Sequence, residues 1–534
     1  MKSDDLKVKA NAFMVQGRFS EAVPVLMKLY KFNSSDDDIL LRLGVSEIKL
    51  GHLEEAQNWL LKACDLKPTN PACYLYLANI QTQNHQAEEA IESYRAAISL
   101  QPDLAIAHLN IASLLMELKQ LDDAEYHYKY VIKLQPGNAD AYANLAQVEE
   151  LLNKIEEARD SVAKALKIVP NHLAALMALG KIEKREKNYS VAEGLFRKIK
   201  TLSSIPSLTA IASFELGHCL DKLGQYDNAY AATLDGKGIL IESIKNLPFD
   251  KSLYQKKIKQ NRDLFDKSDS LSSDMTDNER RAPIFFVGFP RSGTTLVEQI
   301  LNEHTDLVTS DEFPLIDNLI EKIPTIIDTQ KPYPACLDEF TPSDYALLRE
   351  SYWLDASNMI GDLDEHKILV DKLPLNIVEL GFISRLFPNS HILVALRDPR
   401  DVCLSGFMQS FTLNPAMINF TSMESTVDFY NEVMGLWKHY KQVLPINWHE
   451  YKYEDIVDDF DATTRGIFEF FGLDYPEKAE YFYESAKNRM IDTPSYQDVA
   501  TPVYARSKER WRNYKEYFTP YMDKLEPFIT GFGY

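Results

Sequence analysis

A repeat of 34 residues runs through the first half of the chain and narrows the range of folds open to it. Three sets of residues recur at this spacing: Pro68, Pro102, Pro136 and Pro170; Ala22, Ala56, Ala90, Ala124, Ala158 and Ala192; and Gly44, Ala78, Ala112, Ala146 and Gly180. Between them, apolar residues recur every three or four positions, which is typical of amphipathic helices. The small residues let two helices approach closely, and proline ends each second helix because it cannot continue the hydrogen-bond ladder. The period predicts a stack of two-helix units.

Residues 52–80 and 120–148, HLEEAQNWLLKACDLKPTNPACYLYLANI and QLDDAEYHYKYVIKLQPGNADAYANLAQV, resemble the tetratricopeptide repeat family, whose period matches. We expect about six units over residues 10–235. The last is shifted, because Gly217 and Ala229 follow their predecessors by 37 residues. The resemblance implies an all-α superhelix that binds a protein or peptide in its groove. The alternative is an array that only stabilises its neighbour or dimerises.

The helical period stops near residue 235, and a different pattern begins near residue 282. Residues 236–281 read as a helical and polar linker, since they include the Ser- and Asp-rich stretch DKSDSLSSDMTDNERR. Short apolar runs then alternate with helical segments: IFFVGF, KILVDK and HILVALR. This alternation predicts that residues 282–534 form an α/β domain with a mostly parallel sheet covered on both faces.

A phosphate-binding loop is predicted in IFFVGFPRSGTTLVEQIL, residues 284–301. Gly288 and Gly293 have the spacing of a P-loop, with Thr294 at the position of the usual lysine and Thr295 after it. Backbone N–H groups of such a loop bind anions with help from the helix N-terminus. The missing lysine disfavours a kinase or NTPase, because that lysine reaches the β- and γ-phosphates. Arg291 supplies positive charge instead.

A second anion site is predicted in HILVALRDPRDVCLSGF, residues 391–407. Arg397 ends a buried strand, where open α/β sheets bind ligands, and Ser405 follows about two helical turns later. Arginine can bind a phosphate through two hydrogen bonds, and a hydroxyl adds one donor. The alternative is that Arg397 forms an internal ion pair with Asp398 or Asp401.

The two anion motifs together resemble the sulfotransferase superfamily, and PRSGTTL resembles its loop for the 5′-phosphosulfate of 3′-phosphoadenosine-5′-phosphosulfate (PAPS). In having arginine at position 291, the loop resembles that of the tyrosylprotein sulfotransferases and of bacterial proteins that join tetratricopeptide repeats to this domain. The resemblance implies that Arg397 and Ser405 bind the 3′-phosphate. It implies a 5′-phosphosulfate site made by Pro290, Arg291, Ser292, Gly293, Thr294 and Thr295.

The resemblance also implies catalytic residues. Glu312 lies 21 residues after Arg291, the offset of the general base in tyrosylprotein sulfotransferases. Asp311 is the competing carboxylate, and a solvated loop acid or helix cap is the alternative reading of Glu312. Lys372 resembles the lysine beside the leaving group, and a surface lysine is its alternative.

Three further residues near the C-terminus match the family at nucleotide-binding positions. These are Tyr453, Ser495 and Arg510. The alternative is that Tyr453 packs in the core and that Arg510 lies on a surface helix. We therefore predict a PAPS-dependent sulfotransferase acting on an acceptor hydroxyl. A protein or peptide tyrosine is one candidate acceptor. A saccharide, lipid or small-molecule hydroxyl, and an inactive repeat scaffold, remain alternatives.

Charge and composition narrow the partners and the location. The net charge of −21 disfavours nucleic acid as a partner. No apolar run approaches the roughly 20 residues that span a bilayer. The N-terminus has no apolar signal core and the five cysteines are scattered, so we expect a cytoplasmic protein. We expect no metal, and the sequence predicts neither the acceptor nor the oligomeric state.

Overall fold

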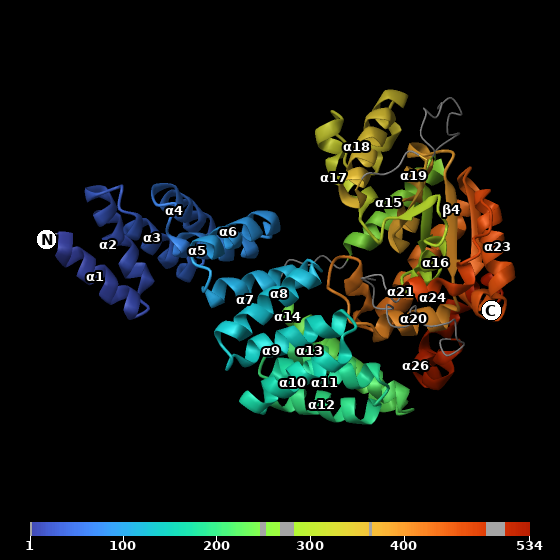
Figure 1. Ribbon diagram of the computed structural model, residues 1–534. Coiled ribbons are helices and arrows are strands. Elements are labelled where there is room, and N and C mark those ends of the chain that lie inside the picture. Colours follow the sequence, from blue (N-terminus) through green and yellow to red (C-terminus); the bar gives the residue numbers. More distant parts are fainter. Residues whose placement is uncertain (1–2, 246–251, 268–281, 362–365, 487–507) are drawn as a thin grey trace. The chain divides into compact units, whose positions relative to one another are not determined.

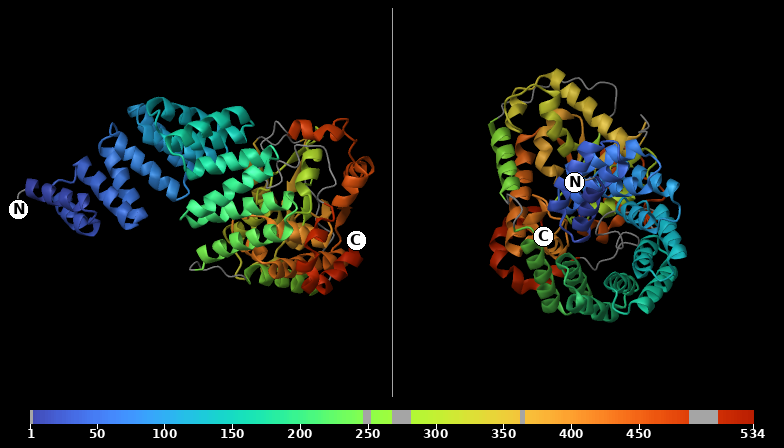
Figure 2. Two further views of the ribbon diagram at one scale, coloured as in Figure 1. Left: turned by 90° about the horizontal axis from the view of Figure 1, so that it is seen from below. Right: turned by 90° about the vertical axis from the view of Figure 1, so that its left-hand side faces the viewer.

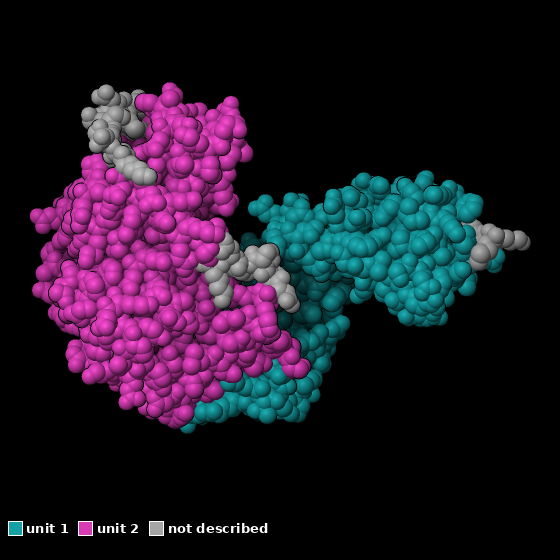
Figure 3. Space-filling model, turned by 180° about the vertical axis from the view of Figure 1, so that it is seen from behind, with its two compact units in different colours: residues 1–203 teal, residues 204–534 magenta. Residues whose placement is uncertain are grey.

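The computed structural model describes residues 3–245, 252–267, 282–361, 366–486 and 508–534. It divides the chain into two compact units, Met1–Ser203 and Ser204–Tyr534 (Figure 3). The first unit is entirely helical over its described residues, and the second contains a parallel sheet surrounded by helices (Figure 1). The predicted fold class, a helical repeat array followed by an α/β domain, is thereby confirmed.

Six helical pairs make up the described part of the first unit, each helix packing on its neighbours in sequence (Figures 1 and 2). The helices are α1 (Ser3–Val15), α2 (Phe19–Phe32), α3 (Asp37–Leu50), α4 (Leu53–Leu66), α5 (Pro71–Gln83), α6 (Ala87–Leu100), α7 (Ala105–Glu117), α8 (Leu121–Leu134), α9 (Ala139–Leu151), α10 (Ile155–Ile168), α11 (Leu173–Arg185) and α12 (Tyr189–Leu202). The periodic alanines are fully buried where the paired helices meet. The periodic prolines follow α4, α6, α8 and α10, as predicted.

A second feature with the same period lies in the turn inside each helical pair, and it is a feature of the backbone conformation. One residue per turn has a positive φ, and these residues are again 34 apart: Gly17, Gly51, His85, Lys119, Asn153 and Lys187. A left-handed residue after a helix satisfies its last carbonyl groups, and glycine adopts that conformation at least cost. Only the first two turns have glycine, so the other four hold side chains in a disfavoured conformation.

The shifted pair, α13 (Pro206–Lys222) and α14 (Tyr226–Ser243), belongs to the second compact unit. Its helices pack as closely as those of the repeats, since a Cβ on Gly217 would lie 2.9 Å from Thr233 Oγ1. α14 continues past residue 235, and α15 (Leu253–Lys267) lies in the segment read as a linker. The domain boundaries at 235 and 281 stay predictions.

Five strands form one parallel sheet in the order β2-β3-β1-β4-β5. They are β1 (Ile284–Gly288), β2 (Leu307–Thr309), β3 (Ile368–Lys372), β4 (His391–Leu396) and β5 (Asn447–Lys452). Successive residues of β1 enter two different cores: Phe285 and Val287 one, Ile284 and Phe286 the other. The sheet is therefore covered on both faces, as predicted. The edge strand β5 was not predicted, because it is polar and partly exposed.

Helices on both faces of the sheet complete the second unit (Figures 1 and 2). They include α16 (Thr294–Leu301), α17 (Leu315–Ile326), α18 (Pro342–Ile360), α19 (Leu380–Leu386), α20 (Pro399–Met408), α21 (Met423–Val443), α22 (Tyr453–Asp458), α23 (Phe460–Phe471), α24 (Phe482–Ala486), α26 (Lys515–Phe518) and α27 (Met522–Phe532). Because all five strands run the same way, their carboxyl ends lie at one edge. Lys372 ends β3, and Arg291, Glu312, Arg397 and Tyr453 come shortly after β1, β2, β4 and β5.

Candidate active site

The loop between β1 and α16 is held tightly by its two glycines. A Cβ on Gly288 would lie 2.8 Å from the carbonyl oxygen of Ala395 on β4, so a side chain would push these strands apart. Gly293 has φ +94°, and a Cβ there would lie 2.6 Å from the Tyr453 ring. Glycine is therefore required at both positions by close packing, and at Gly293 also by its backbone conformation.

The polar residues of this loop surround the start of α16. Ser292, Thr294 and Thr295 are buried, and the Ser292 hydroxyl donates a hydrogen bond to the Phe289 carbonyl across the turn. Successive N–H groups at a helix N-terminus attract anions. Arg291 has φ +75°, a disfavoured conformation in which its guanidinium reaches α20.

The two predicted anion sites meet at one place. Arg291 Nε donates to Ser405 Oγ over 3.2 Å, and Arg397 Nη1 donates to the carbonyl oxygen of Arg291 over 3.0 Å. Arg397 also lies over the Tyr453 ring, 4.8 Å from its centroid. The structure thus brings Arg291, Arg397, Ser405 and Tyr453 into a single cluster beside the loop.

The acids considered as ion-pair partners of Arg397 have other partners. Asp398 accepts the backbone N–H of Arg400 and forms an ion pair with its guanidinium at 2.6 Å. Asp401 Oδ1 accepts the backbone N–H of Trp511 over 2.7 Å. Both acids therefore serve to fix the start of α20 and its contact with the C-terminal segment.

A second charged cluster lies at the carboxyl end of β3. Lys372 is fully buried, and its Nζ lies 2.8 Å from Glu312 Oε1 and 3.0 Å from Glu298 Oε2. Its backbone N–H donates to Ser310 Oγ over 2.9 Å, which ties β3 to the segment after β2. The structure therefore does not support the surface-lysine reading of Lys372.

The backbone at Glu312 is held in a costly conformation. Asp311 and Glu312 have φ of 47° and 65°, the left-handed region that non-glycine residues avoid. Backbone strain of this kind persists only where surrounding contacts enforce it, and it is concentrated at functional sites. Glu312 is partly exposed, with 38% of its side chain accessible, so an acceptor could reach its carboxylate.

Glu298 was missed in the sequence. It comes from α16, and 1% of its side chain is exposed. Burial raises its pKa to about 7, although the Lys372 charge opposes this shift. Burial also lowers the pKa of Lys372, but the charges of Glu298 and Glu312 outweigh that effect and raise the pKa overall. The one signal that could have revealed it is that Glu298 is a lone acid inside the apolar helix TTLVEQIL.

The predicted nucleotide-binding residues of the C-terminal segment are only partly placed. Ser495 lies outside the described residues. Arg510 forms an ion pair with Asp221 of α13 at 3.0 Å and contacts Met408 Sδ at 3.2 Å. Met408 is three residues beyond Ser405 on α20, so the two face the same side of the helix. Arg510 therefore contacts the helix that holds Ser405, at a residue about one turn further along it.

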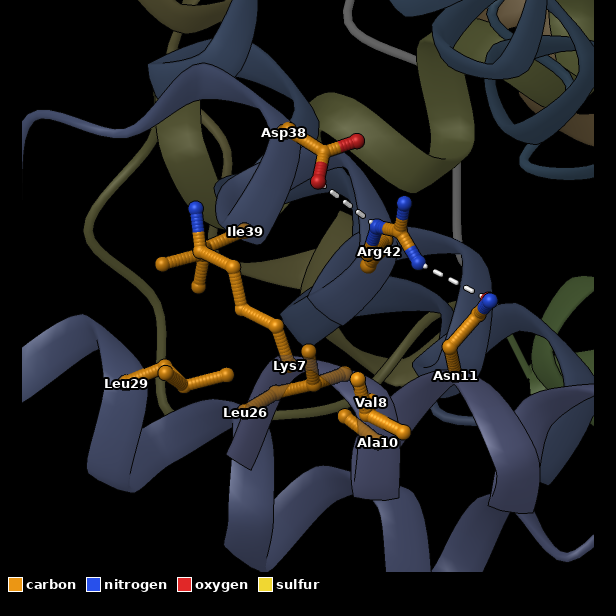
Figure 4. Close-up of a pocket in the computed structure, with 9 residues that line it drawn as sticks. All are labelled: Lys7, Val8, Ala10, Asn11, Leu26, Leu29, Asp38, Ile39 and Arg42. Carbon is orange, nitrogen blue, oxygen red and sulfur yellow. Dashed lines mark hydrogen bonds and ion pairs between the residues drawn. The ribbon is translucent and has the colours of Figure 1, made fainter. Parts of the chain in front are cut away.

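Two surface pockets lie within the first unit, away from these residues in sequence. One is formed by α1, α2 and α3, where Arg42 bonds Asp38 and Asn11 (Figure 4). The other is lined mainly by α3 and α5 and includes Tyr76, Asn79 and Asn110. Asn79 Oδ1 accepts hydrogen bonds from Asn110 Nδ2 and from the Tyr94 hydroxyl.

No group of three or more His, Cys, Asp or Glu residues suited to a metal ion occurs within the described ranges. Among the helices whose residues are described, none is long and apolar enough to cross a bilayer.

Known families match both halves of the chain. Residues 283–477 match the sulfotransferase family, and residues 8–71, 82–119 and 115–182 match tetratricopeptide repeats. An uncharacterized protein of Aquifex aeolicus is 27% identical over 351 residues, which cover 64% of this chain and 45% of that protein. The chain thus spans less than half the length of this relative.

Protein-tyrosine sulfotransferases are also similar. Protein-tyrosine sulfotransferase A of Caenorhabditis elegans is 24% identical over 50% of this chain and 70% of its own length. Protein-tyrosine sulfotransferase 1 of Homo sapiens is 30% identical over 22% of this chain and 31% of its own length. Among solved structures, YrrB, described as a TPR protein with an unusual peptide-binding site, is 23% identical with a TM-score of 0.30, covering 32% of this chain and 87% of that chain.

Proposed function

Because the chain joins tetratricopeptide repeats to a domain of the sulfotransferase family, we propose that it transfers a sulfonate group from PAPS to an acceptor hydroxyl. The observation that carries this proposal is the meeting of Arg291, Ser405 and Arg397. PAPS bears charge at both its 5′- and 3′-positions, and two adjacent anion-binding elements suit such a nucleotide better than they suit ATP.

The roles in the reaction follow from the two clusters. The acceptor oxygen forms a bond to sulfur while its proton passes to the Glu312 carboxylate. The bond between sulfur and the 5′-phosphate oxygen breaks, and its electron pair leaves with adenosine 3′,5′-bisphosphate. Arg291 and Lys372 stabilise the charge that develops on the leaving phosphate. The loop residues 290–295, Tyr453 and Arg510 would hold the nucleotide.

Discrimination between two nucleotides tests the proposed donor. PAPS and adenosine 5′-phosphosulfate differ only in the 3′-phosphate, so wild type should bind PAPS far more tightly. Arg397→Gln should lose about tenfold or more of this preference, because it removes a charged hydrogen bond to phosphate. Arg400→Gln is the matched control, since Arg400 pairs with Asp398. Equal binding of both nucleotides by wild type would refute the donor assignment.

The acceptor is proposed to be a protein or peptide, with tyrosine as the sulfated residue. The similarity to protein-tyrosine sulfotransferases and the repeat array support this choice. The pocket lined by Asn79 and Asn110 offers amide groups that can pair with a peptide backbone. Transfer of radiolabelled sulfonate to tyrosine peptides, and its loss in Tyr→Phe peptides, is the test.

Other acceptors and an inactive scaffold are the alternatives. Equal labelling of Tyr→Phe peptides, or labelling of carbohydrate or small hydroxyl compounds alone, would reject tyrosine while leaving sulfonate transfer intact. Nucleotide binding without transfer to any acceptor in a whole-cell lysate would favour the scaffold. Glu312→Ala is the control for transfer, and its kcat should fall about 10²-fold or more if Glu312 is the general base. A cytoplasmic location stays a prediction.

A further inference from the structure

Glu298 occupies an unusual place for a carboxylate. It projects from α16, whose other residues are also buried, and its Oε2 lies 3.0 Å from Lys372 Nζ. Neither of its carboxylate oxygens has a hydrogen-bond partner among the described residues, so its contact with Lys372 is an ion pair. A buried carboxylate loses its hydration, and one ion pair rarely compensates for that loss fully. Glu298 therefore lowers the stability of the fold, and its presence calls for a functional explanation.

The need to neutralise the charge of Lys372 does not explain why Glu298 is buried there. Glu312 already pairs with the same ammonium at 2.8 Å and is partly exposed, so it could balance the charge at less cost. With Glu298 ionised, one buried cation faces two carboxylates, and the cluster carries one excess negative charge near Asp311.

The reaction changes this balance. When Glu312 takes the acceptor proton it becomes neutral. Without Glu298, no charged side chain among the described residues would then hold the buried Lys372 ammonium in place beside the leaving phosphate. Glu298 is the other carboxylate within ion-pair distance of Lys372 among the described residues, and it comes from the helix that begins at the phosphate loop. Its rigid setting keeps the ammonium in one place through the proton transfer.

We propose that Glu298 is a positioning residue, which holds the Lys372 ammonium at the carboxyl end of β3 while the charge on Glu312 changes. This inference rests on the proposed sulfonate transfer. Glu298 contacts neither the nucleotide nor the acceptor in this role, and it acts through Lys372 alone.

A double-mutant cycle tests that dependence. Glu298→Gln should lower kcat about tenfold or more, because small displacements of a catalytic group are costly. The KM for PAPS should stay within about threefold, since the interaction matters most in the transition state. Lys372→Met should lower kcat further, and adding Glu298→Gln to Lys372→Met should cause no additional loss. Glu303→Gln, which alters an acid bonded to Ser485, is the control.

Independent effects that multiply in the double variant, or a wild-type kcat in Glu298→Gln, would overturn the inference. Melting temperatures give a second reading if a single variant folds poorly. Lys372→Met leaves Glu298 buried without its cation, so the double variant should melt at a higher temperature than Lys372→Met. A double variant that melts lower also overturns the inference. If wild type neither binds adenosine 3′,5′-bisphosphate nor transfers sulfonate, the proposed function fails, and these melting temperatures still test the pairing.

Discussion

Asp311 and Glu312 show how a single segment can exchange stability for geometry. Both residues have left-handed backbone conformations directly after β2, and Ser310 before them is fixed to β3 through Lys372. Because of this strained conformation, the backbone turns away from the direction of β2, and the Glu312 carboxylate lies against Lys372. The strained backbone lowers the stability of the fold, but it fixes the position of the Glu312 carboxylate, the proposed base.

Replacing Asp311 by glycine should therefore separate stability from activity. Asp311→Gly should raise the unfolding free energy by about 1 kcal/mol relative to Asp311→Ala, because alanine retains the left-handed penalty. Its kcat should fall below that of Asp311→Ala, since the neighbouring Glu312 gains freedom. Chemical denaturation and sulfonate transfer measure the two effects. A glycine variant no more stable than the alanine variant would show that φ at this position is not strained.

Titration of Glu298 predicts a pH dependence. Its pKa of about 7 means that it loses its charge, and its hold on Lys372, as the pH falls through about 7. The groups facing it are Lys372, Glu312 and Asp311. The kcat of wild type should therefore rise between pH 6 and pH 8, taken as about one unit on either side of this pKa. A pH–rate profile of Glu298→Gln should lack this rise, and an unchanged profile would contradict the assignment.

At the scale of elements, four turns of the repeats place a non-glycine residue in the left-handed conformation, which lowers their stability slightly. Lys187 is an exposed residue with φ 65° between α11 and α12, where glycine fits better. Lys187→Gly should raise the unfolding free energy by about 0.5–1 kcal/mol. Lys198→Gly, in the middle of α12, should lower it by about 1 kcal/mol, because glycine weakens a helix interior. Thermal melts of the two variants should therefore shift in opposite directions.

The elements that could be predicted are those with a local pattern. The repeat helices, β1, β3, β4 and the phosphate loop each have their own periodicity or turn residues. β5 could not be recognised, because an exposed edge strand has no continuous apolar run. Glu298 was overlooked because its meaning depends on Lys372, which lies far away in sequence. The role of Glu312 came from resemblance, and its strain is visible only in the backbone.

For the molecule as a whole, the main consequence is that α13 and α14 are built into the unit containing the sheet. Asp221 on α13 accepts hydrogen bonds from Arg510 over 3.1 Å and from the Tyr514 hydroxyl over 2.6 Å. On α14, the buried Lys237 donates to the carbonyl oxygen of Gln409 over 2.8 Å. These contacts join residues that lie 172 to 293 positions apart, so the sequence period could not reveal them.

A fragment of residues 204–534 should therefore fold cooperatively, whereas residues 282–534 should not. Asp221→Asn in the full chain should lower the unfolding free energy of this unit by about 2 kcal/mol, because it leaves Arg510 with a weakened partner. Asp227→Asn, at a more exposed bond to Tyr517, is the matched control and should have a smaller effect. Calorimetry of both fragments and both variants is the measurement, and a stable 282–534 fragment would contradict the expectation.

The order of the strands also bears on how the chain is made. Each repeat helix packs on helices next to it in sequence, so the first unit can form while the ribosome is still translating. β1 sits in the middle of the sheet, and its neighbours are β3 and β4, which emerge much later. Its apolar residues must then stay exposed until translation reaches β4, and this interval is when the nascent chain has the greatest need of a chaperone.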